Sequence, residues 1–375
     1  MKIALFGGSF DPVHNEHVRY VQAAKAALGL DRVYIIPSHI APHKAFGAAA
    51  SGADRLQMCN LAFRNLPYAE VSDYELRAAG TSYSYLTCRA FAERFPNDEL
   101  YFLVGADMLE DFFTWKNPDD ILAHATLVAC GREGENPAEF REKFFRRFGK
   151  EFISISFAGD AAASHKLRVD LAFRKPTPDL DRAVRRYIDE NRLYGHPAIA
   201  PALALEKPQR REHSYRVALM AVARARSVGV AEGKALLASA LHDCAKYVPL
   251  TSPLLEDFTP PENVPPPVMH QYTGAYLARH AFGIEDEEVL DAIRYHTSGR
   301  AGMTALGKLV FLADMLESGR SFDGVERLRE IFWKDLDGCF YEALREQTEY
   351  LAASGGRVYP LTREAYEYEK ARQNR

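Results

Sequence analysis

The stretch GGSFDPVHNEH, residues 7–17, follows a short apolar run and decides how the first half of the chain folds. The apolar run indicates a buried strand, the paired glycines allow a tight turn that a ligand can approach closely, and helical spacing begins after the proline. A strand, a glycine turn and a helix N-terminus together offer N–H groups and a positive dipole end to an anion. Because His14 and His17 lie where that anion would bind, the stretch predicts a phosphate site.

Length and composition indicate a soluble protein of two domains. The chain has 375 residues, of which 47% are hydrophobic and 26% charged, and this length exceeds that of one typical domain. A net charge of −4 argues against a nucleic-acid surface, and no apolar run approaches the roughly 20 residues that cross a membrane. The five cysteines show no paired spacing, and no signal peptide precedes the first strand, so we expect a cytoplasmic protein.

Three further apolar runs alternate with segments of helical periodicity in the first half of the chain. The expected strands span residues 32–37, 69–72 and 100–104, and the expected helices begin near residue 14 and span residues 54–66 and 84–95. This alternation predicts a parallel, doubly wound α/β sheet. Lys44 follows the second strand, where a side chain can meet a ligand's phosphate at the carboxyl end of an open sheet; a solvated loop lysine is the alternative.

Several motifs of this half, taken in order, resemble the bacterial nicotinate-nucleotide adenylyltransferases of the HxGH nucleotidyltransferase superfamily. The resemblance covers residues 1–195 and rests on the stretch 7–17, PHK at 42–44, SYS at 82–84, GAD at 105–107, and Trp115. It implies a Rossmann-like domain in which the phosphate of nicotinate mononucleotide attacks the α-phosphorus of ATP and pyrophosphate leaves. Catalysis would then depend on positioning and charge stabilisation, without a protein nucleophile.

The same resemblance assigns roles to single residues. His14 and His17 would hold the phosphates of ATP, while Lys44 with Mg²⁺ would neutralise the outgoing pyrophosphate. The remaining ATP and substrate contacts would come from Gly7, Gly8, Ser9, Phe10, Ser84, Gly105, Asp107, Trp115, Arg132, Ser164 and Arg168.

Two positions of this half depart from the family pattern. Glu16 stands where the superfamily motif has glycine, and it brings a negative charge to a phosphate site. The late Ile-Ser-Ser-Thr-Glu-Ile-Arg motif is replaced by AASHKLR at residues 162–168, which keeps one serine and the arginine. These departures leave two alternatives open for the first domain: a nucleotide-binding or sensing module, and an enzyme that uses a different phosphate ester.

The second half contains no strand pattern and indicates an all-α domain. A proline-containing linker at residues 196–208 precedes this domain, which we place at residues 209–375. Its expected helices include residues 232–247 and 274–282, with a proline-rich loop at residues 257–268 between them. These helices bring polar residues into apolar surroundings, and an adjacent His-Asp pair is costly to bury without a partner or a metal. Ligands from separate helices can converge inside a bundle, so the sequence predicts a site for one or two transition metals; helix capping and arginine pairing are the alternatives. The candidate ligands are His213, His242, Asp243, His270, His296 and Asp314.

From residue 208 to about 370 the chain resembles the YqeK-type symmetrical diadenosine tetraphosphatases of the HD phosphohydrolase superfamily. The motifs are REHSYRV at 211–217, LHDCAK at 241–246, IRYHTSGR at 293–300 and LAD at 312–314, with Glu317 and Arg320. The resemblance implies an enzyme that splits diadenosine tetraphosphate into two ADP. His213, His242, Asp243 and Asp314 would bind one metal, and Asp243, His270 and His296 the other, with iron or manganese as the expected ions. Lys246, Arg294 and Arg300 would contact the polyphosphate, with Lys246 at the leaving group, whereas His280 is expected to be structural.

Together the two resemblances imply a bifunctional enzyme that binds ATP, nicotinate mononucleotide and diadenosine tetraphosphate. The residues leave open the choice between nicotinate and nicotinamide, the identity of the second domain's metal, and whether the chain forms a homo-oligomer.

Overall fold

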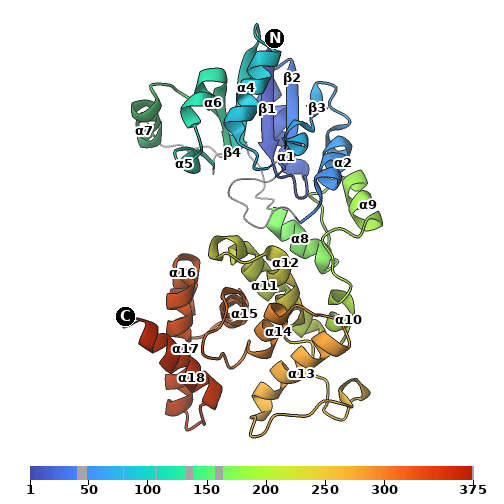
Figure 1. Cartoon of the computed structure of the whole chain (residues 1–375), viewed down its shortest axis with the longest axis vertical. Coiled ribbons are helices and arrows are strands. Elements are labelled where there is room, and N and C mark those ends of the chain that lie inside the picture. Colours follow the sequence, from blue (N-terminus) through green and yellow to red (C-terminus); the bar gives the residue numbers. More distant parts are fainter. Residues whose placement is uncertain (40–48, 79, 106–107, 132–137, 157–163, 374–375) are drawn as a thin grey trace. The chain divides into compact units, whose positions relative to one another are not determined.

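The chain forms two compact units in the computed structural model, which describes residues 1–375 except 40–48, 79, 106–107, 132–137, 157–163 and 374–375 (Figure 1). The first unit comprises Met1–Leu167 and Pro176–Tyr194, and the second comprises Arg168–Lys175 and Gly195–Arg375. Among the described residues, no helix has both the length and the apolar character needed to cross a membrane.

The first unit contains a six-stranded sheet in the order β3-β2-β1-β4-β5-β6, and every neighbouring pair is parallel. The strands are β1 (Lys2–Gly8), β2 (Arg32–Pro37), β3 (Ala69–Val71), β4 (Glu99–Gly105), β5 (Thr126–Gly131) and β6 (Ile153–Ser156). The strand order reverses direction between β1 and β4, and an open α/β sheet binds ligands beyond the carboxyl ends of its strands at such a point. The predicted doubly wound fold is confirmed, and it places the phosphate stretch after β1 beside the end of β4.

The strands of this sheet are buried because helices cover them. Residues 3–5 of β1 and residues 33–36 of β2 are fully buried, as expected for the apolar runs of parallel strands. The helices are α1 (Asn15–Leu28), α2 (Gly52–Phe63), α3 (Tyr74–Arg77), α4 (Ser84–Arg94), α5 (Met108–Phe112), α6 (Pro118–His124), α7 (Ala138–Phe148), α8 (Ser164–Ala172) and α9 (Arg182–Glu190). Helix α8 begins in the first unit, but from Arg168 onward its residues belong to the second.

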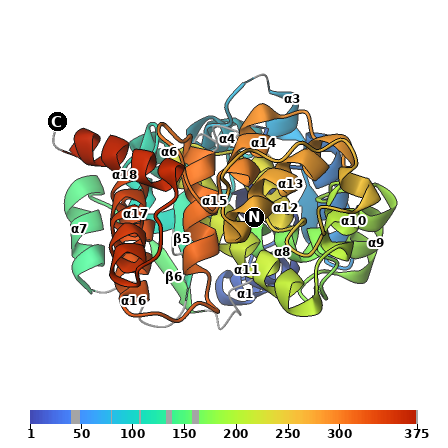
Figure 2. The same ribbon diagram turned by 90° about the horizontal axis from the view of Figure 1, so that it is seen from below.

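The described part of the second unit is helical, as the sequence predicts. Helix α15 (Ala305–Leu316) is buried along most of its length and packs against α11, α12, α14, α16 and α17, so it forms the centre of the bundle (Figures 1 and 2). The other elements are α10 (Ile199–Ala204), α11 (Pro208–Ala225), η1 (Arg226–Val228), α12 (Glu232–Leu241), η2 (Pro253–Leu255), α13 (Pro266–His280), α14 (Glu287–Arg294), α16 (Val325–Lys334), α17 (Leu336–Ala353) and α18 (Pro360–Gln373).

The prolines of the second half do not exclude helices where the sequence suggested loops. Residues 196–208, expected to be a linker, contain α10, and its Ile199 and Ala202 lie in the core of the second unit. Helix α13 begins at Pro266, well before the expected start at Gly274. In both helices the prolines occupy the first turn, where the missing N–H has no helical partner to lose.

Two candidate active sites

The loop after β1 is held rigidly by a buried carboxylate. Asp11 is fully buried and accepts hydrogen bonds from the N–H groups of Ala49 (2.7 Å) and Ala50 (3.1 Å) and from the Tyr194 hydroxyl (2.8 Å). The Phe10 ring folds back on Gly8, where a Cβ atom would lie only 3.1 Å from that ring. A side chain at this glycine would therefore require the Phe10 ring to shift by a few tenths of an ångström.

His14 and His17 lie together at the start of α1. The His14 N–H donates to His17 Nδ1 at 3.1 Å, and the ring centroids are 3.8 Å apart. Because His17 Nδ1 accepts this bond, a neutral His17 carries its proton on Nε2, where it can donate to a phosphate. Burial lowers the pKa of His14 to about 4, so this imidazole is neutral at pH 7. His14 Nδ1 is buried and makes no hydrogen bond to the described residues, as expected of an atom that waits for a ligand or water.

A cavity of about 430 Å³ opens beside the phosphate loop. Eight of the residues implied by the resemblance line it: Gly7, Gly8, Ser9, Phe10, His17, Ser84, Gly105 and Trp115. Glu75 also lines this cavity and carried no motif signal in the sequence. It is 7% exposed, burial raises its pKa, and its Oε1 accepts the Thr87 hydroxyl at 2.6 Å. The structure thus brings most of the predicted residues to one cavity and adds a buried acid to its wall.

Glu16, the residue that departs from the HxGH pattern, has a compensating partner. Its Oε1 lies 2.6 Å from Nη1 of Arg19, one turn further along α1. The negative charge that Glu16 brings to the phosphate site is therefore balanced locally.

The remaining predicted residues of the first domain have different outcomes. Lys44, Asp107 and Arg132 lie outside the described residues. Ser164 donates from Oγ to the Pro12 carbonyl at 3.4 Å, next to the phosphate loop. Arg168 is buried and forms an ion pair with Glu232, and both residues belong to the second unit; its expected contact with ATP stays a prediction.

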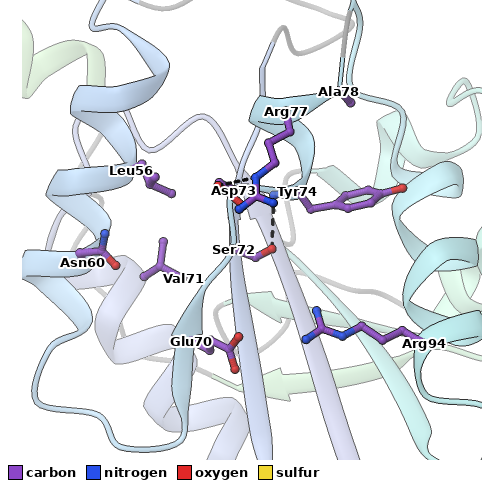
Figure 3. Close-up of a pocket in the computed structure, with 10 residues that line it drawn as sticks. All are labelled: Leu56, Asn60, Glu70, Val71, Ser72, Asp73, Tyr74, Arg77, Ala78 and Arg94. Carbon is purple, nitrogen blue, oxygen red and sulfur yellow. Dashed lines mark hydrogen bonds and ion pairs between the residues drawn. The ribbon is translucent and has the colours of Figure 1, made fainter.

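A larger cavity of about 760 Å³ lies along the edge strand β3 and contains none of the predicted site residues (Figure 3). Its charged groups include Glu70, Arg94 and the pair of Asp73 with Arg77, in which Oδ2 and Nε are 2.7 Å apart. The motifs and the histidine pair therefore point to the smaller cavity as the nucleotide site of this unit.

In the second unit all six predicted metal ligands converge. They come from α11 (His213), the turn after α12 (His242 and Asp243), α13 (His270), the turn after α14 (His296) and α15 (Asp314). His213 Nε2 is 2.9 Å from Asp314 Oδ1, while Asp243 Oδ1 is 3.1 Å from His270 Nε2 and 3.5 Å from His296 Nε2. Two ligands about 2.1 Å from one ion at tetrahedral angles are about 3.4 Å apart, so these spacings suit shared metal ions.

The His-Asp pair lies where α12 ends. We expected these residues inside a longer helix, but α12 ends at Leu241, and tighter turns follow in which Cys244 N–H bonds to Leu241 and Lys246 N–H to Asp243. His242 still has helical backbone angles (φ −54°, ψ −40°), and both side chains belong to one group of candidate ligands.

Three of the histidines are oriented through Nδ1. The partners are Glu317 Oε1 for His213 (3.0 Å), the Ser239 carbonyl for His242 (2.7 Å) and the Ile293 carbonyl for His296 (2.8 Å). An imidazole that donates from Nδ1 keeps its Nε2 lone pair for a metal. His242 Nε2 is buried without a hydrogen-bond partner among the described residues, and its nearest carboxylate oxygens are 3.6 and 3.9 Å away. This donor set therefore fits a metal centre.

The electrostatics of this centre also favour a metal ion. Burial lowers the pKa of His242 to about 3, so the imidazole stays neutral. Burial alone would raise the pKa of Asp243, but the surrounding histidines His242, His270 and His296 hold it well below its usual range. Neutral imidazole and ionised carboxylate are the forms that bind metal.

Three positively charged side chains contact the carboxylates of the candidate ligands Asp243 and Asp314. Arg210 Nη1 lies 2.9 Å from Asp243 Oδ2, Arg320 Nη2 lies 2.7 Å from Asp314 Oδ1, and Lys246 Nζ lies 3.5 Å from Asp243 Oδ1. Arg210, which the sequence reasoning missed, precedes His213 by three residues on α11. That spacing puts both side chains on one face of the helix, and it is the signal that could have found this residue.

The other two predicted arginines have different surroundings. The Arg300 guanidinium pairs with Asp291 at 2.7 Å and donates to the Ala301 carbonyl, and its expected role toward the polyphosphate stays a prediction. Arg294 lines a separate cavity of about 330 Å³. His280 stacks on Tyr276 with ring centroids 4.3 Å apart, in keeping with the structural role expected of it.

Comparisons with known proteins match the two halves of the chain to two different families. Residues 5–177 match the cytidylyltransferase-like family and residues 210–319 match the HD domain family. A Mycoplasma genitalium protein named "Probable nicotinate-nucleotide adenylyltransferase/Ap4A hydrolase" is 30% identical over 324 residues, which cover 85% of this chain and 88% of that protein. A Desulfitobacterium hafniense protein named "Probable nicotinate-nucleotide adenylyltransferase" is 33% identical and covers 52% of this chain and 95% of its own length.

Among solved structures, a "predicted HD superfamily hydrolase involved in NAD metabolism" from Clostridium acetobutylicum is 30% identical. The match covers 47% of this chain and 96% of the solved chain, with a TM-score of 0.44. The matching relative that spans both units, together with the two matching family models, defines the identity of the chain. It belongs to the family of the nicotinate-nucleotide adenylyltransferase/Ap4A hydrolases.

Proposed function

We propose that the chain carries out two reactions. The first unit transfers AMP from ATP to nicotinate mononucleotide, giving nicotinate adenine dinucleotide and pyrophosphate. The second unit hydrolyses diadenosine tetraphosphate to two ADP at a dinuclear metal centre. The observation that carries the second activity is the convergence of six ligands with three imidazoles anchored through Nδ1; the first rests on the histidine pair beside the cavity.

In the first unit the protein acts by positioning, since the substrate phosphate is itself the nucleophile. His17 donates from Nε2 to an α- or β-phosphate oxygen, and this bond strengthens as negative charge develops on the leaving pyrophosphate. Mg²⁺, when bound with ATP, neutralises part of that charge. The pyridine ring lies in the 430 Å³ cavity near Ser84 and Trp115.

In the second unit the donor set would be divided between two ions. His213, His242, Asp243 and Asp314 would hold one, and Asp243 with His270 and His296 would hold the other. Iron or manganese, when bound, supplies positive charge for the phosphoryl group and makes water more acidic.

The cations beside this centre bind the substrate. Asp243 and Asp314 would serve as metal ligands, so their partners Arg210 and Arg320 would be available to contact the phosphate oxygens, for which guanidinium is well suited. Lys246, 32% exposed and 3.0 Å from His270 Nε2, stabilises the departing ADP.

Product analysis on the purified full chain tests both activities. With ATP and nicotinate mononucleotide we expect the dinucleotide and pyrophosphate, and with diadenosine tetraphosphate plus Mn²⁺ or Fe²⁺ we expect ADP alone. Product with pantetheine phosphate but not with nicotinate mononucleotide would replace the first substrate. Release of AMP and ATP from diadenosine tetraphosphate would contradict symmetrical cleavage.

A further inference from the structure

The Nδ1 partner of His213 differs in kind from the Nδ1 partners of His242 and His296. His242 and His296 each donate from Nδ1 to a main-chain carbonyl three residues earlier. His213 instead meets the side chain of Glu317, which follows α15 and lies 104 residues further along the chain. A carboxylate carries a full charge that a carbonyl lacks, so the Nδ1–H group of His213 has a stronger electrostatic partner than those of His242 and His296.

Glu317 is itself fixed from three directions. It is 2% exposed, its Oε2 accepts hydrogen bonds from Arg216 Nε and from the Gly319 N–H, and its Oε1 faces His213 Nδ1 at 3.0 Å. Arg216 follows His213 by three residues on α11, so both residues reach the same carboxylate from one helix face. The carboxylate therefore cannot turn away from the imidazole without losing its other bonds.

We infer that Glu317 is a positioning residue, which fixes the Nδ1–H tautomer of His213 and strengthens the bond from His213 Nε2 to the metal. Arg216 keeps the Glu317 carboxylate in place. The inference rests on the proposed function only in taking His213 as a metal ligand. Outer partners of this kind commonly change metal affinity about 10- to 100-fold when they are removed.

The competing explanation is a purely structural ion pair that joins α11 to α15. Three variants of the full chain separate the two roles. Glu317→Gln keeps an oxygen that can accept from His213 Nδ1 but removes the charge, and Glu317→Ala removes both. Arg216→Met breaks the same ion pair without touching His213, and it serves as the matched control.

Two measurements apply to each variant: ¹⁵N NMR of labelled histidines in the metal-free chain, which reports tautomers, and calorimetric titration with Mn²⁺. We expect Glu317→Gln to keep the His213 tautomer and weaken Mn²⁺ binding about 10-fold or more. Glu317→Ala should lose the tautomer as well, while the tautomers of His242 and His296 stay unchanged. Arg216→Met should weaken binding less than Glu317→Gln.

The inference is overturned if folded Glu317→Ala keeps both the His213 tautomer and the wild-type Mn²⁺ affinity, or if Arg216→Met reproduces every effect of Glu317→Gln. Failure of the proposed function looks different. A chain that binds Mn²⁺ and shows the His213 effect, yet leaves diadenosine tetraphosphate intact, contradicts the substrate assignment and leaves the role of Glu317 standing.

Discussion

Replacing Arg210 by methionine should tighten metal binding while it impairs hydrolysis. The Arg210 guanidinium pairs with Asp243, a carboxylate that is 1% exposed and that also serves as a ligand in the proposed metal centre. A metal ion and Arg210 therefore compete for the same negative charge. By linkage, a group that stabilises only the metal-free state weakens metal binding by the same free energy.

The size of this effect follows from the geometry of the pair. Two unit charges 4 Å apart interact by about 4 kcal/mol at an effective dielectric constant of 20. Arg210 is 22% exposed, and Lys246 also faces Asp243, so water and a second cation compensate part of the loss. We expect a net change of about 1–2 kcal/mol, which corresponds to Mn²⁺ binding about 5- to 30-fold tighter in Arg210→Met.

Metal-free stability should change in the opposite direction. The same 1–2 kcal/mol should lower the unfolding midpoint of the second unit, which has about 190 residues, by about 2–8 °C in the absence of metal. Saturating Mn²⁺ should remove most of this difference.

Calorimetric titration with Mn²⁺ and thermal unfolding with and without the ion provide the assay. Arg211→Met is the matched control, because it removes the same charge from the next position, where the side chain donates to the Glu206 carbonyl instead. Weaker Mn²⁺ binding in Arg210→Met would refute the reasoning, since Arg210 would then support the metal-bound state. An equal gain in Mn²⁺ affinity in Arg211→Met would show that the change in net charge alone causes the effect.

Three further predictions concern the two sites separately. His17→Ala should remove most adenylyl transfer, measured by pyrophosphate release, whereas Glu16→Gly should leave it unchanged or modestly higher; loss of turnover in Glu16→Gly would mean that this residue has an additional role. His242→Gln should abolish ADP formation from diadenosine tetraphosphate and metal binding while adenylyl transfer continues, and an unchanged phosphatase rate would exclude the metal assignment. Burial lowers the pKa of His14 to about 4 in the folded protein, below its ordinary 6.5. Protonation of His14 therefore favours the unfolded chain, and the free energy of unfolding should fall by about 2–3 kcal/mol between pH 6.5 and pH 4. His14→Asn, which keeps a residue suited to the helix N-cap, should show a smaller loss in denaturant unfolding of the first unit between pH 7.5 and 4.5, and an identical loss would show that other groups cause it.

Periodic patterns predicted four of the six strands and several of the helices. The strand at 32–37 matches β2, and the expected start of the helix at Ser84 matches α4. Strands β5 (Thr126–Gly131) and β6 (Ile153–Ser156) were not expected; β6 has only four residues at a sheet edge, which alternate between partial or full burial and exposure. Helix α10 was missed because its proline resembled a linker signal, although a proline in a first turn costs a helix little.

The convergence of the candidate metal ligands was predictable because histidine and aspartate are rarely buried in apolar helices without a reason. Their cationic neighbours were harder to predict. Arg210 and Arg320 act through positions that only the bundle brings together, and a single arginine leaves no periodic trace in a sequence. The sequence also gives no sign that α8 passes from one unit to the other at Arg168.

The acceptors that orient the histidines also separate local from long-range steps in folding. His242 and His296 each need only a carbonyl three residues earlier, so each ring can adopt its metal-binding orientation as soon as its own turn forms. His213 requires the carboxylate of Glu317, which follows α15. Its ring is therefore oriented only after α11 and α15 have packed together. A metal ion bound through His213 therefore ties the first helix of the HD region to the buried centre of the bundle, and its release would loosen that long-range contact before it disturbs the two local turns.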